Sequence, residues 1–504
     1  MNLAQKIESR QGVIAVIGLG YVGLPLAVNF AKAGFQVIGI DTNQARVDAI
    51  NRGESYVSDI ESAQVAALTT AHPSNGPLTR SEPDSESRHR MPAIQPSTLG
   101  NANRLSATTD FDVLHNTDAV IICVPTPLDE SKNPDMSHII AVTDEISQRL
   151  HRDMLVILES TTYPGTTGEL VLPHLQVRKY KESEFESVNG RVKAAVVGEA
   201  TPAFSHVGPP LVSEADQQQL VVGEDFYLAF SPERIDPGRI DYTVDNTPKV
   251  IGGVTSQCTK MAKALYECAI KHIVPVSSPE VAEMVKLLEN TFRAVNIALV
   301  NEVAIMCDQL GIDVWEVIEA AKTKPFGFMP FYPGPGLGGH CIPIDPQYLA
   351  WKLKLLNYNA RFIQLAAEVN FNMPQYVLGK IADALNEAAK ALNGSRVLIL
   401  GVAYKADIGD LRESPALNLI HLLQEKGAIV TYHDPYVPHM NVDGLKMTSE
   451  SLNHDTLQAA DCVVIATAHS YYDWNAVVQH SQLVVDTRNA TKDETAGQAR
   501  IVKL

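Results

Sequence analysis

The chain has 504 residues, of which 45% are hydrophobic and 20% are charged, and its formal net charge at pH 7 is −17. This composition is typical of a soluble globular protein with two or three domains. The acidic balance argues against a nucleic-acid partner, which needs a basic patch, although local cations can still bind a small anion. No apolar run approaches a membrane span and the N-terminus has no apolar signal core, so we expect a cytoplasmic protein without a membrane partner.

In chain order, residues 12–41 come first, with the sequence "GVIAVIGLGYVGLPLAVNFAKAGFQVIGID". The pattern predicts a buried strand, a glycine turn, a helix and a second strand that ends in an acid. Gly18, Gly20 and Gly23 form GxGxxG, which lets backbone N–H groups approach a pyrophosphate at the helix N-terminus. Asp41 is placed to accept hydrogen bonds from a ribose diol, so the pattern favours NAD over NADP.

Three later segments each read as an apolar strand followed by a polar turn: "DAVIICVPTP" (118–127), "MLVILESTTYPGTT" (154–167) and "DFYLAFSPERIDPG" (225–238). Strand ends of this kind line the cofactor crevice of open α/β sheets. Residues 62–106 and 178–222 are rich in Ser, Pro and charge, and we expect both to be mobile insertions without chemistry.

A long helix is predicted over residues 277–311, with Ser278 as its N-cap and Gly311 at its end. Its apolar character suggests a central spine or a dimer interface. Three polar residues share one face of this helix, at spacings of three and four: Glu283, Lys286 and Asn290. A further helical stretch is expected from Pro346 to Leu392.

The alternation of strand, loop, helix and strand restarts at residue 394 and ends at Asp434, without a GxGxxG. Lys405 and Arg412 precede the helix, where a phosphate would meet two cations and a helix N-terminus. Spacing alone is equally consistent with ordinary surface charge. The sequence therefore predicts an α/β protein with two Rossmann-like doubly wound domains joined by a long central helix. The expected domains are residues 1–276 for NAD, 277–392 as a helical dimerisation domain, and 393–504 for a second nucleotide.

Six cysteines occur in the chain, without a CxxC pair or zinc-type spacing, so we predict no metal site. Five lie in apolar surroundings typical of small buried side chains. Cys341 is different, because it lies within "GPGLGGHCIPIDP" (334–346), which contains four glycines and three prolines. Such a stretch forms neither a regular helix nor a central strand.

Taken together, these segments resemble the UDP-glucose/GDP-mannose dehydrogenase family of nucleotide-sugar 6-dehydrogenases. The resemblance covers nearly the whole chain in family order. It rests on "VIGLGYVGLPLA", "CVPTP", "ESTTYPGTT", "SPERIDPG", "EMVKLLENTFRAVNIALVNE", "GPGLGGHCIPIDP" and "GVAYKADIGDLRESPA". The histidine before the cysteine resembles the branch that acts on N-acetylated UDP-hexosamines. The substrate implied is UDP-N-acetylglucosamine, with UDP-N-acetylmannosamine or UDP-glucose as alternatives.

The resemblance implies a four-electron oxidation of the sugar C6 alcohol to a carboxylate, with two NAD⁺ reduced in turn, for surface polysaccharide precursors. An aldehyde must gain a nucleophile before a second hydride can leave, and a thiolate supplies one through a thiohemiacetal that is oxidised to a thioester. Cys341 is then the nucleophile. A homo-oligomer, dimeric or larger, is also implied.

The resemblance assigns further roles by motif. Asp345 orients or deprotonates the hydrolytic water, Lys286 and Asn290 hold the C6 oxygen, and Glu233 is the acid–base carboxylate. Thr126 is expected near the nicotinamide and a catalytic water. The implied NAD-binding residues are Gly18, Gly20, Tyr21, Val22, Gly23, Asp41, Arg46, Thr126 and Arg412. The implied substrate-binding residues are Glu233, Lys286, Asn290, Phe331, Tyr332, Pro333, Gly334, Gly338 and Lys405.

Two rival interpretations remain at this point. A two-electron β-hydroxyacid dehydrogenase also has a GxGxxG domain and a helical lysine, but it has no second Rossmann-like domain and needs no loop cysteine. A non-catalytic module that senses NAD or a nucleotide would have no use for Lys286, Asn290, Cys341 and Asp345 together.

Overall fold

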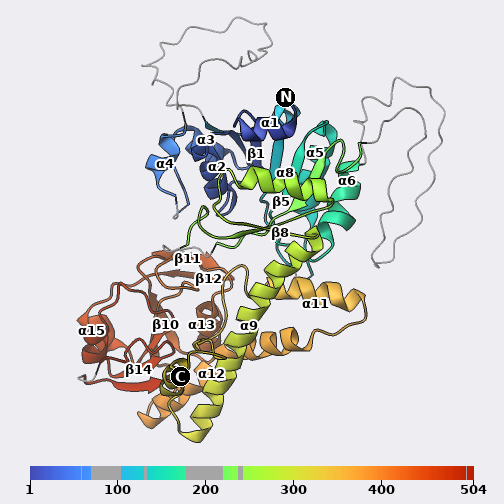
Figure 1. Ribbon diagram of the computed structural model, residues 1–504. Coiled ribbons are helices and arrows are strands. Elements are labelled where there is room, and N and C mark those ends of the chain that lie inside the picture. The colour runs from blue at the N-terminus through green and yellow to red at the C-terminus, as the bar shows by residue number, and fades with distance from the viewer. Residues whose placement is uncertain (58–59, 70–103, 130–132, 177–219, 236–241, 495–496) are drawn as a thin grey trace, which may run out of the picture. The chain divides into compact units, whose positions relative to one another are not determined.

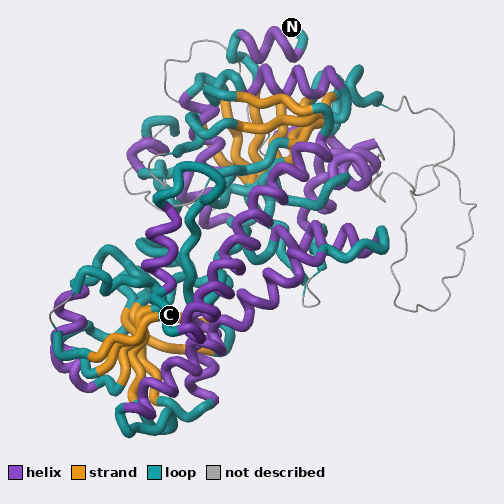
Figure 2. The backbone as a smooth tube through the Cα atoms, turned by 60° about the horizontal axis from the view of Figure 1, so that its bottom comes forward, coloured by secondary structure: helices purple, strands orange, loops and turns teal. Residues whose placement is uncertain are grey.

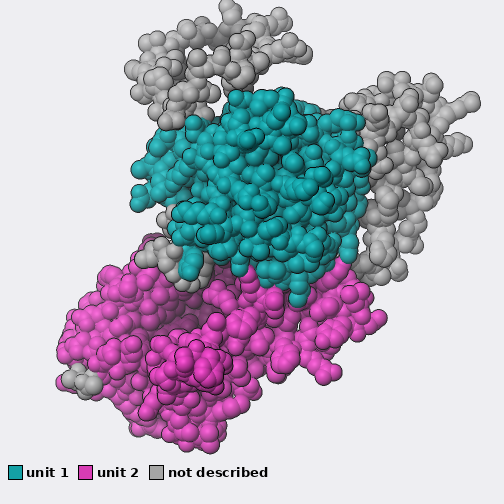
Figure 3. All heavy atoms as spheres, in the orientation of Figure 1, with its two compact units in different colours: residues 1–127, 135–286 teal, residues 128–134, 287–504 magenta. Residues whose placement is uncertain are grey.

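The computed structural model describes residues 1–57, 60–69, 104–129, 133–176, 220–235, 242–494 and 497–504. The chain divides into two compact units, coloured separately in Figure 3. Unit 1 comprises Met1–Pro127 and Asp135–Lys286, and unit 2 comprises Leu128–Pro134 and Leu287–Leu504.

Unit 1 is built on an eight-stranded sheet with the order β3-β2-β1-β4-β5-β6-β7-β8. Every neighbouring pair is parallel except β6 and β7, which are antiparallel. The first six strands have the order of a dinucleotide-binding Rossmann sheet. The strands are β1 (Val13–Ile17), β2 (Gln36–Ile40), β3 (Leu105–Thr108), β4 (Ala119–Ile122), β5 (Leu155–Leu158), β6 (Tyr227–Phe230), β7 (Lys249–Gly253) and β8 (Ile273–Val276).

Both faces of this sheet are covered, which is why its central strands are apolar throughout. In β1, Ile14 and Val16 enter one hydrophobic core while Ala15 and Ile17 enter the core on the opposite face. Figures 1 and 2 show helices on the two sides of the strands. The helices are α1 (Leu3–Glu8), α2 (Gly23–Lys32), α3 (Gln44–Asn51), α4 (Ser62–Ala66), η1 (Phe111–Asn116), α5 (Ser137–Arg149), η2 (Thr167–Val171), α6 (Leu172–Gln176) and α8 (Ser256–Tyr266).

The two stretches expected to be insertions are partly regular at their ends. Residues 62–66 form α4, whose Val65 is buried with Leu68, and Leu105 starts β3. These apolar side chains join the unit 1 core, so the expected boundary at residue 62 was placed too early. Most of both stretches lies outside the described residues.

The predicted long helix is α9 (Pro279–Leu310), which begins in unit 1 and continues through unit 2. Three more helices belong to unit 2: α10 (Val314–Lys322), α11 (Asp345–Leu355) and α12 (Arg361–Glu387). The helical stretch expected from about Pro346 to Leu392 consists of two helices, α11 and α12. Asn357 adopts a φ of 58°, in the left-handed region that ends a helix, and this break separates α11 from α12.

Unit 2 also contains a five-stranded parallel sheet with the order β10-β9-β13-β14-β15. In β9, Val397 and Ile399 pack into one core and Leu398 and Leu400 into another, so this sheet is also covered on both faces. Its strands are β9 (Arg396–Leu400), β10 (Ile429–His433), β13 (Cys462–Ile465), β14 (Leu483–Asp486) and β15 (Arg500–Lys503). Unit 2 also contains a hairpin of β11 (His439–Val442) and β12 (Leu445–Thr448). Three further helices complete this unit: α13 (Pro415–Glu425), α14 (His454–Ala459) and α15 (Trp474–His480).

The predicted fold class is confirmed, since two Rossmann-like sheets occur with α9 between them in the chain. Among the described residues, no helix is long and apolar enough to cross a membrane.

Candidate active site

The glycine turn between β1 and α2 is shaped by close backbone contacts. Gly18 has a φ of +90°, and a Cβ on Gly23 would lie 1.8 Å from the Gly18 carbonyl oxygen. Neither position therefore accepts a side chain. A Cβ on Gly20 would meet nothing within 4 Å, so this part of the turn faces open space. The N-terminus of α2, capped by Val22 without a side-chain hydrogen bond, follows directly.

Asp41 follows β2, as the sequence predicted, and is 8% exposed. Its carboxylate accepts hydrogen bonds from the backbone N–H groups of Leu19 and Asn43, both at 2.9 Å, and from Arg46 Nη1 at 3.3 Å. Arg46 lies over the ring of Tyr56, 5.6 Å from its centroid. Sequence reasoning missed Tyr56, whose hydroxyl donates to the Leu19 carbonyl at 2.7 Å and whose pKa burial and Asp41 raise to about 12.

These residues fit NAD. The turn offers an open approach at Gly20 and a helix N-terminus for a pyrophosphate, and Asp41 is a carboxylate fixed by backbone donors at the end of the next strand. Tyr21 is 48% exposed on the same turn. Thr126 follows β4, a neighbour of β1, and is partly buried.

A second group of predicted residues in unit 1 centres on Glu233, which follows β6. Its Oε1 accepts from the backbone N–H groups of Arg234 at 2.7 Å and Ile235 at 2.6 Å. Its Oε2 lies 3.2 Å from Lys249 Nζ. Burial opposes ionisation, but Lys249, the Ile235 N–H and Lys286 outweigh it and lower the pKa of Glu233. This group is therefore a carboxylate poised to accept a proton.

Lys286 is 8% exposed on α9, and its charge acts on Glu233 within unit 1. Asn290 is 7% exposed one helical turn later. The spacing of four residues puts the two side chains on the same helix face, as predicted. A buried ammonium and a buried amide on one face supply fixed hydrogen-bond donors.

The loop with the cysteine belongs to unit 2, where three predicted catalytic residues come together. Asn290 Nδ2 donates to Asp345 Oδ2 at 2.5 Å, and the Asp345 backbone N–H donates to the Cys341 carbonyl at 2.7 Å. Asp345 is 3% exposed and begins α11. The Cys341 side chain is partly exposed. The turn that ends at Asp345 therefore fixes the carboxylate and the cysteine relative to each other.

Glycines in this loop let it pack against the second Rossmann-like domain. A Cβ on Gly334 would lie 2.4 Å from Arg488 Nη1, and one on Gly338 would lie 2.7 Å from Tyr404 Cβ. The Gly334 N–H donates to Asn301 Oδ1 at 2.9 Å. Phe331 makes an edge-to-face contact with Phe292 on α9, at 5.8 Å between centroids.

Unit 2 contains a cavity of about 590 Å³ beside this loop. It brings together the predicted residues Tyr332, Pro333 and Lys405. The other lining residues were not predicted: Trp315, Glu319, Lys322, Tyr404, Ala406, Thr467, Ala468, Arg488, Asn489 and Lys492. Four of the lining residues are cations, and Trp315 stacks on Tyr332 with 6.3 Å between ring centroids. Aromatic faces beside cations suit a nucleotide with its phosphates.

Models of three protein-domain types match the sequence. The NAD binding domain of the UDP-glucose/GDP-mannose dehydrogenase family matches residues 12–82 and 95–270. The central domain of that family matches residues 280–372, and its UDP binding domain matches residues 398–493. The chain belongs to the UDP-glucose/GDP-mannose dehydrogenase family. It is therefore an NAD-dependent nucleotide-sugar dehydrogenase.

Curated relatives in this family match over nearly the whole chain. A UDP-N-acetyl-D-mannosamine dehydrogenase of Methanococcus maripaludis is 31% identical, over 91% of this chain and 86% of its own length. A UDP-N-acetyl-D-glucosamine 6-dehydrogenase of Pseudomonas aeruginosa is 32% identical over 91% of both chains. The solved structure of the UDP-D-ManNAc dehydrogenase of Pyrococcus horikoshii has a TM-score of 0.74 at 29% identity, and the match covers 97% of this chain and 99% of that one.

The family's UDP binding domain includes Lys405 and Arg488, two cations of the cavity. Burial lowers the pKa of Arg488 to about 10, against the effect of Asp486, and its Nε donates to the Ala466 carbonyl at 2.9 Å. A partly dehydrated guanidinium at a nucleotide pocket is a strong partner for phosphate. Sequence spacing gave no signal for Arg488, because it lies on the loop after β14, far along the chain from Lys405.

Arg412 also lies in unit 2, where it pairs with Asp410 at 2.6 Å. Its carbonyl accepts from the N–H of Gly339 in the cysteine loop at 3.0 Å. Its contact with NAD stays a prediction.

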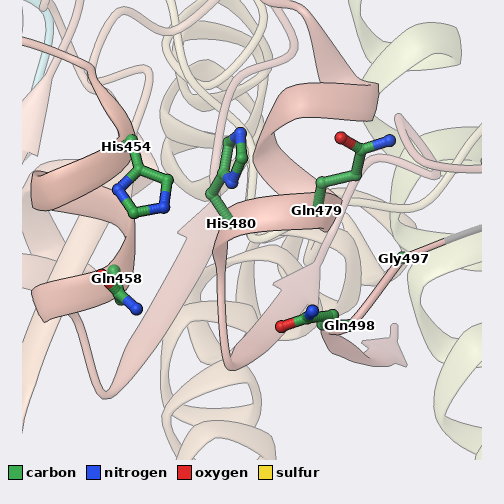
Figure 4. Close-up of a pocket in the computed structure, with 6 residues that line it drawn as sticks. All are labelled: His454, Gln458, Gln479, His480, Gly497 and Gln498. Atoms are coloured by element: carbon green, nitrogen blue, oxygen red, sulfur yellow. The ribbon is translucent and has the colours of Figure 1, made fainter.

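A further cavity of about 660 Å³ lies between α14, α15 and the chain before β15, and Figure 4 shows its lining. It is lined by His454, Gln458, Gln479, His480, Gly497 and Gln498, none of which was a predicted site residue. The His454 and His480 rings lie 4.6 Å apart, edge to face. Over the described ranges, no group of three or more His, Cys, Asp or Glu side chains could hold a metal ion.

Proposed function

We propose that this dehydrogenase oxidises C6 of a UDP-N-acetylhexosamine, foremost UDP-N-acetylglucosamine, to the uronate through a thioester on Cys341. The contact that carries the proposal is the turn in which Asp345, hydrogen-bonded to Asn290, is fixed against the backbone of Cys341. The relatives named above supply the sugar class, because they include dehydrogenases of UDP-N-acetylmannosamine and UDP-N-acetylglucosamine. UDP-N-acetylmannosamine and UDP-glucose are the alternatives.

In the first oxidation, C6 loses a hydride and its hydroxyl loses a proton. NAD⁺, when bound at the glycine turn, supplies the hydride acceptor. Glu233 is proposed to take the proton, since its carboxyl is ionised. The backbone N–H groups of Arg234 and Ile235 hold the carboxylate in place through Oε1. Lys286 and Asn290 hold the C6 oxygen as it gains negative charge, and both are buried, so their donors need little reorganisation.

In the second oxidation, the Cys341 sulfur adds to the aldehyde carbon, and the aldehyde oxygen gains a proton to give a thiohemiacetal. This adduct loses its hydroxyl proton to solvent and a second hydride, for which a second NAD⁺ would be the acceptor when bound, and this leaves a thioester. Water then adds to the thioester carbonyl, and the thiol departs to release the carboxylate. Asp345 is proposed to orient and deprotonate that water, because the turn at the start of α11 fixes its backbone against that of Cys341. Thr126 is proposed to hold a water near the nicotinamide.

The unit 2 cavity is proposed to bind the UDP group. Its cations offset the diphosphate charge, and Tyr332, Pro333 and Lys405 line it as expected for substrate contacts. The products are proposed to feed surface polysaccharide synthesis. A thiol nucleophile needs a reducing compartment, so we place the enzyme in the cytoplasm.

A homodimer is proposed to form on α9. Leu288, Leu299, Met306 and Leu310 recur at spacings of eleven, seven and four on this helix, and each is at least 49% exposed. Such spacings put the four on one face. An apolar stripe of this length is a large exposed patch for a monomer, and a second copy of the chain would cover it. Leu299→Glu with Met306→Glu is expected to give a monomer by light scattering; a monomeric parent protein would contradict the proposal.

The function is tested with purified protein, NAD⁺ and a panel of UDP-sugars, with NADH followed by absorbance. UDP-N-acetylglucosamine is expected to give the highest kcat/KM and two NADH for each sugar consumed. One NADH per sugar would remove the thioester step. A higher kcat/KM with UDP-N-acetylmannosamine or UDP-glucose would replace the proposed substrate but leave the chemistry in place.

A further inference from the structure

A buried network of charged and polar side chains lies behind Glu233 in unit 1. Lys249 Nζ lies 2.7 Å from Glu159 Oε2 and 3.2 Å from Glu233 Oε2. The other oxygen of Glu159 accepts a short hydrogen bond from the hydroxyl of Tyr266. Glu159 is 1% exposed, Lys249 4% and Tyr266 not at all.

The topology of the sheet explains how these residues meet. Glu159 follows β5 and Glu233 follows β6, and because these strands are parallel neighbours, both acids lie at the same edge of the sheet. Lys249 is the first residue of β7, which runs antiparallel to β6, so the start of β7 reaches the edge where β6 ends. Tyr266 is the last residue of α8.

Two carboxylates share one ammonium in this network, and their pKa values are shifted in opposite directions. Burial raises the pKa of Glu159 in spite of Lys249. The pKa of Glu233 is lowered, because it also has two backbone donors and the charge of Lys286. Burial alone would lower the pKa of Lys249, but Glu159 and Glu233 together raise it, so it stays protonated.

The titratable groups that act on Glu233 come from five elements around it. They are Cys123 after β4, Glu159 after β5, Lys249 of β7, Tyr266 of α8 and Lys286 of α9. Lys286 already has a proposed role at the substrate. Lys249 is the cation whose ammonium bonds Glu233 directly and is enclosed by protein.

We propose that Lys249 is a positioning residue for the reaction: it holds the Glu233 carboxylate in place and ionised, while Glu159 and Tyr266 hold Lys249. The proposal rests on the proposed role of Glu233 as the proton acceptor. Lys249 acts only through Glu233, so it sets the pH at which turnover begins and leaves the binding of NAD and UDP-sugar to other residues.

The test is the pH profile of kcat, with KM for both substrates, for the parent enzyme and its variants at Lys249. Lys249→Met is expected to move the acidic limb upward by at least about one pH unit, since an adjacent cation lowers a carboxyl pKa by that much. KM for NAD⁺ should change less than about twofold, the scatter expected for a residue that contacts neither substrate. Lys249→Arg keeps the charge and is expected to restore most of the limb. An acidic limb that stays in place in Lys249→Met would overturn the proposal.

One further variant separates this proposal from the function on which it rests. Glu233→Gln is expected to be inactive at every pH, and full activity would overturn both the role of Glu233 and that of Lys249. If Lys249→Met does not fold, as judged by circular dichroism, Tyr266→Phe and the neutral pair Glu159→Gln with Lys249→Met take its place. Each is expected to raise the acidic limb, Tyr266→Phe by less. Unmoved limbs in both would contradict the proposal.

Discussion

The two Rossmann-like sheets place an aspartate at the same point, after the second strand of the motif, but use it differently. Asp41 follows β2 and Asp434 follows β10, and each accepts from the backbone of the turn after the first strand, from Leu19 at 2.9 Å and Val402 at 2.8 Å. Asp434 is also bonded to the buried His469 at 3.0 Å, with neither side chain exposed.

This difference separates a cofactor site from a structural one. The side-chain partner of Asp41 is Arg46, at 3.3 Å and with a side chain 44% exposed, so the aspartate can still serve a ribose. Inside the domain, the Asp434 carboxylate is bonded to His469 and accepts from three backbone N–H groups, those of Val402, Ala403 and Tyr436. We therefore propose that the second sheet binds its nucleotide elsewhere, at the cavity with Lys405 and Arg488. On this proposal, one topology supports two kinds of nucleotide site.

The largest effect is expected at Asp434. Asp434→Ala leaves His469 buried without its carboxylate and three backbone N–H groups without their acceptor, which should cost roughly 3–5 kcal/mol of stability. Calorimetry should show a lower melting temperature for the variant. Asp455→Ala is the control, since that side chain is 96% exposed. Equal melting temperatures for Asp434→Ala and the parent would mean that the pair with His469 has no structural role.

Asp41→Ala is expected to act on NAD rather than on stability. Loss of charge-assisted hydrogen bonds to a ribose should weaken NAD⁺ binding roughly 10- to 100-fold, measured by titration calorimetry. UDP affinity should not change, and Asp48→Ala on the exposed side of α3 serves as the control. Unchanged NAD⁺ affinity would show that the two aspartates do not differ in the proposed way.

Much of this comparison could be predicted from the sequence. GxGxxG and Asp41 lie in one short segment, and Cys341 and Asp345 lie four residues apart in a loop whose glycines and prolines exclude regular structure. Local spacing was enough to find them.

The residues that sequence reasoning missed depend on distant strands. Lys249 reaches Glu233 because β7 runs antiparallel to β6, and Arg488 reaches the cavity from the loop after β14. No motif marks the single antiparallel pair among the described strands of the first sheet, and β7 itself was not predicted. His469 likewise meets Asp434 across 35 residues of chain.

A pH experiment sharpens the contrast between buried carboxylates of the two units. Glu283 accepts from the N–H groups of Gly165 and Thr167 and from the Thr167 hydroxyl, all neutral donors, and burial raises its pKa to about 7. The pKa of Asp434 is lowered, because its bond to His469 outweighs burial.

The two carboxyls therefore make stability depend on pH in opposite directions. Between its ordinary pKa of 4.5 and about 7, folded Glu283 keeps a proton that the unfolded chain releases, so stability falls as pH rises through this range. The contribution of Asp434 is present above its ordinary pKa and is lost as pH falls through its lowered value.

As pH rises from 5.5 to 7, the free energy of unfolding of Glu283→Gln should increase by about 2 kcal/mol relative to that of the parent, because glutamine does not titrate. Melting temperatures across this range measure the gain, with the exposed Glu224→Gln as the control. A constant difference between Glu283→Gln and the parent would contradict the raised pKa.

The smallest effect is expected in the nucleotide cavity. Arg488→Gln and Lys405→Gln should each weaken UDP binding about tenfold, since each removes one charged contact to phosphate. NAD⁺ affinity should stay the same, and Lys426→Gln, exposed and outside the cavity lining, is the matched control. A loss of NAD⁺ affinity in place of UDP affinity would reverse the assignment of the two sheets.

The central claim is that the Cys341 sulfur carries the sugar C6 through the second oxidation, as a thiohemiacetal and then a thioester. Mass spectrometry of enzyme quenched during turnover tests this claim most directly. The enzyme, UDP-N-acetylglucosamine and NAD⁺ are mixed and quenched in acid within milliseconds, and peptides are then mapped. We expect an acyl adduct of the sugar nucleotide on Cys341 that is absent in Cys341→Ser, together with loss of uronate formation in that variant. Abundant uronate from the parent without any adduct on Cys341, or full uronate formation by Cys341→Ser, would contradict the account.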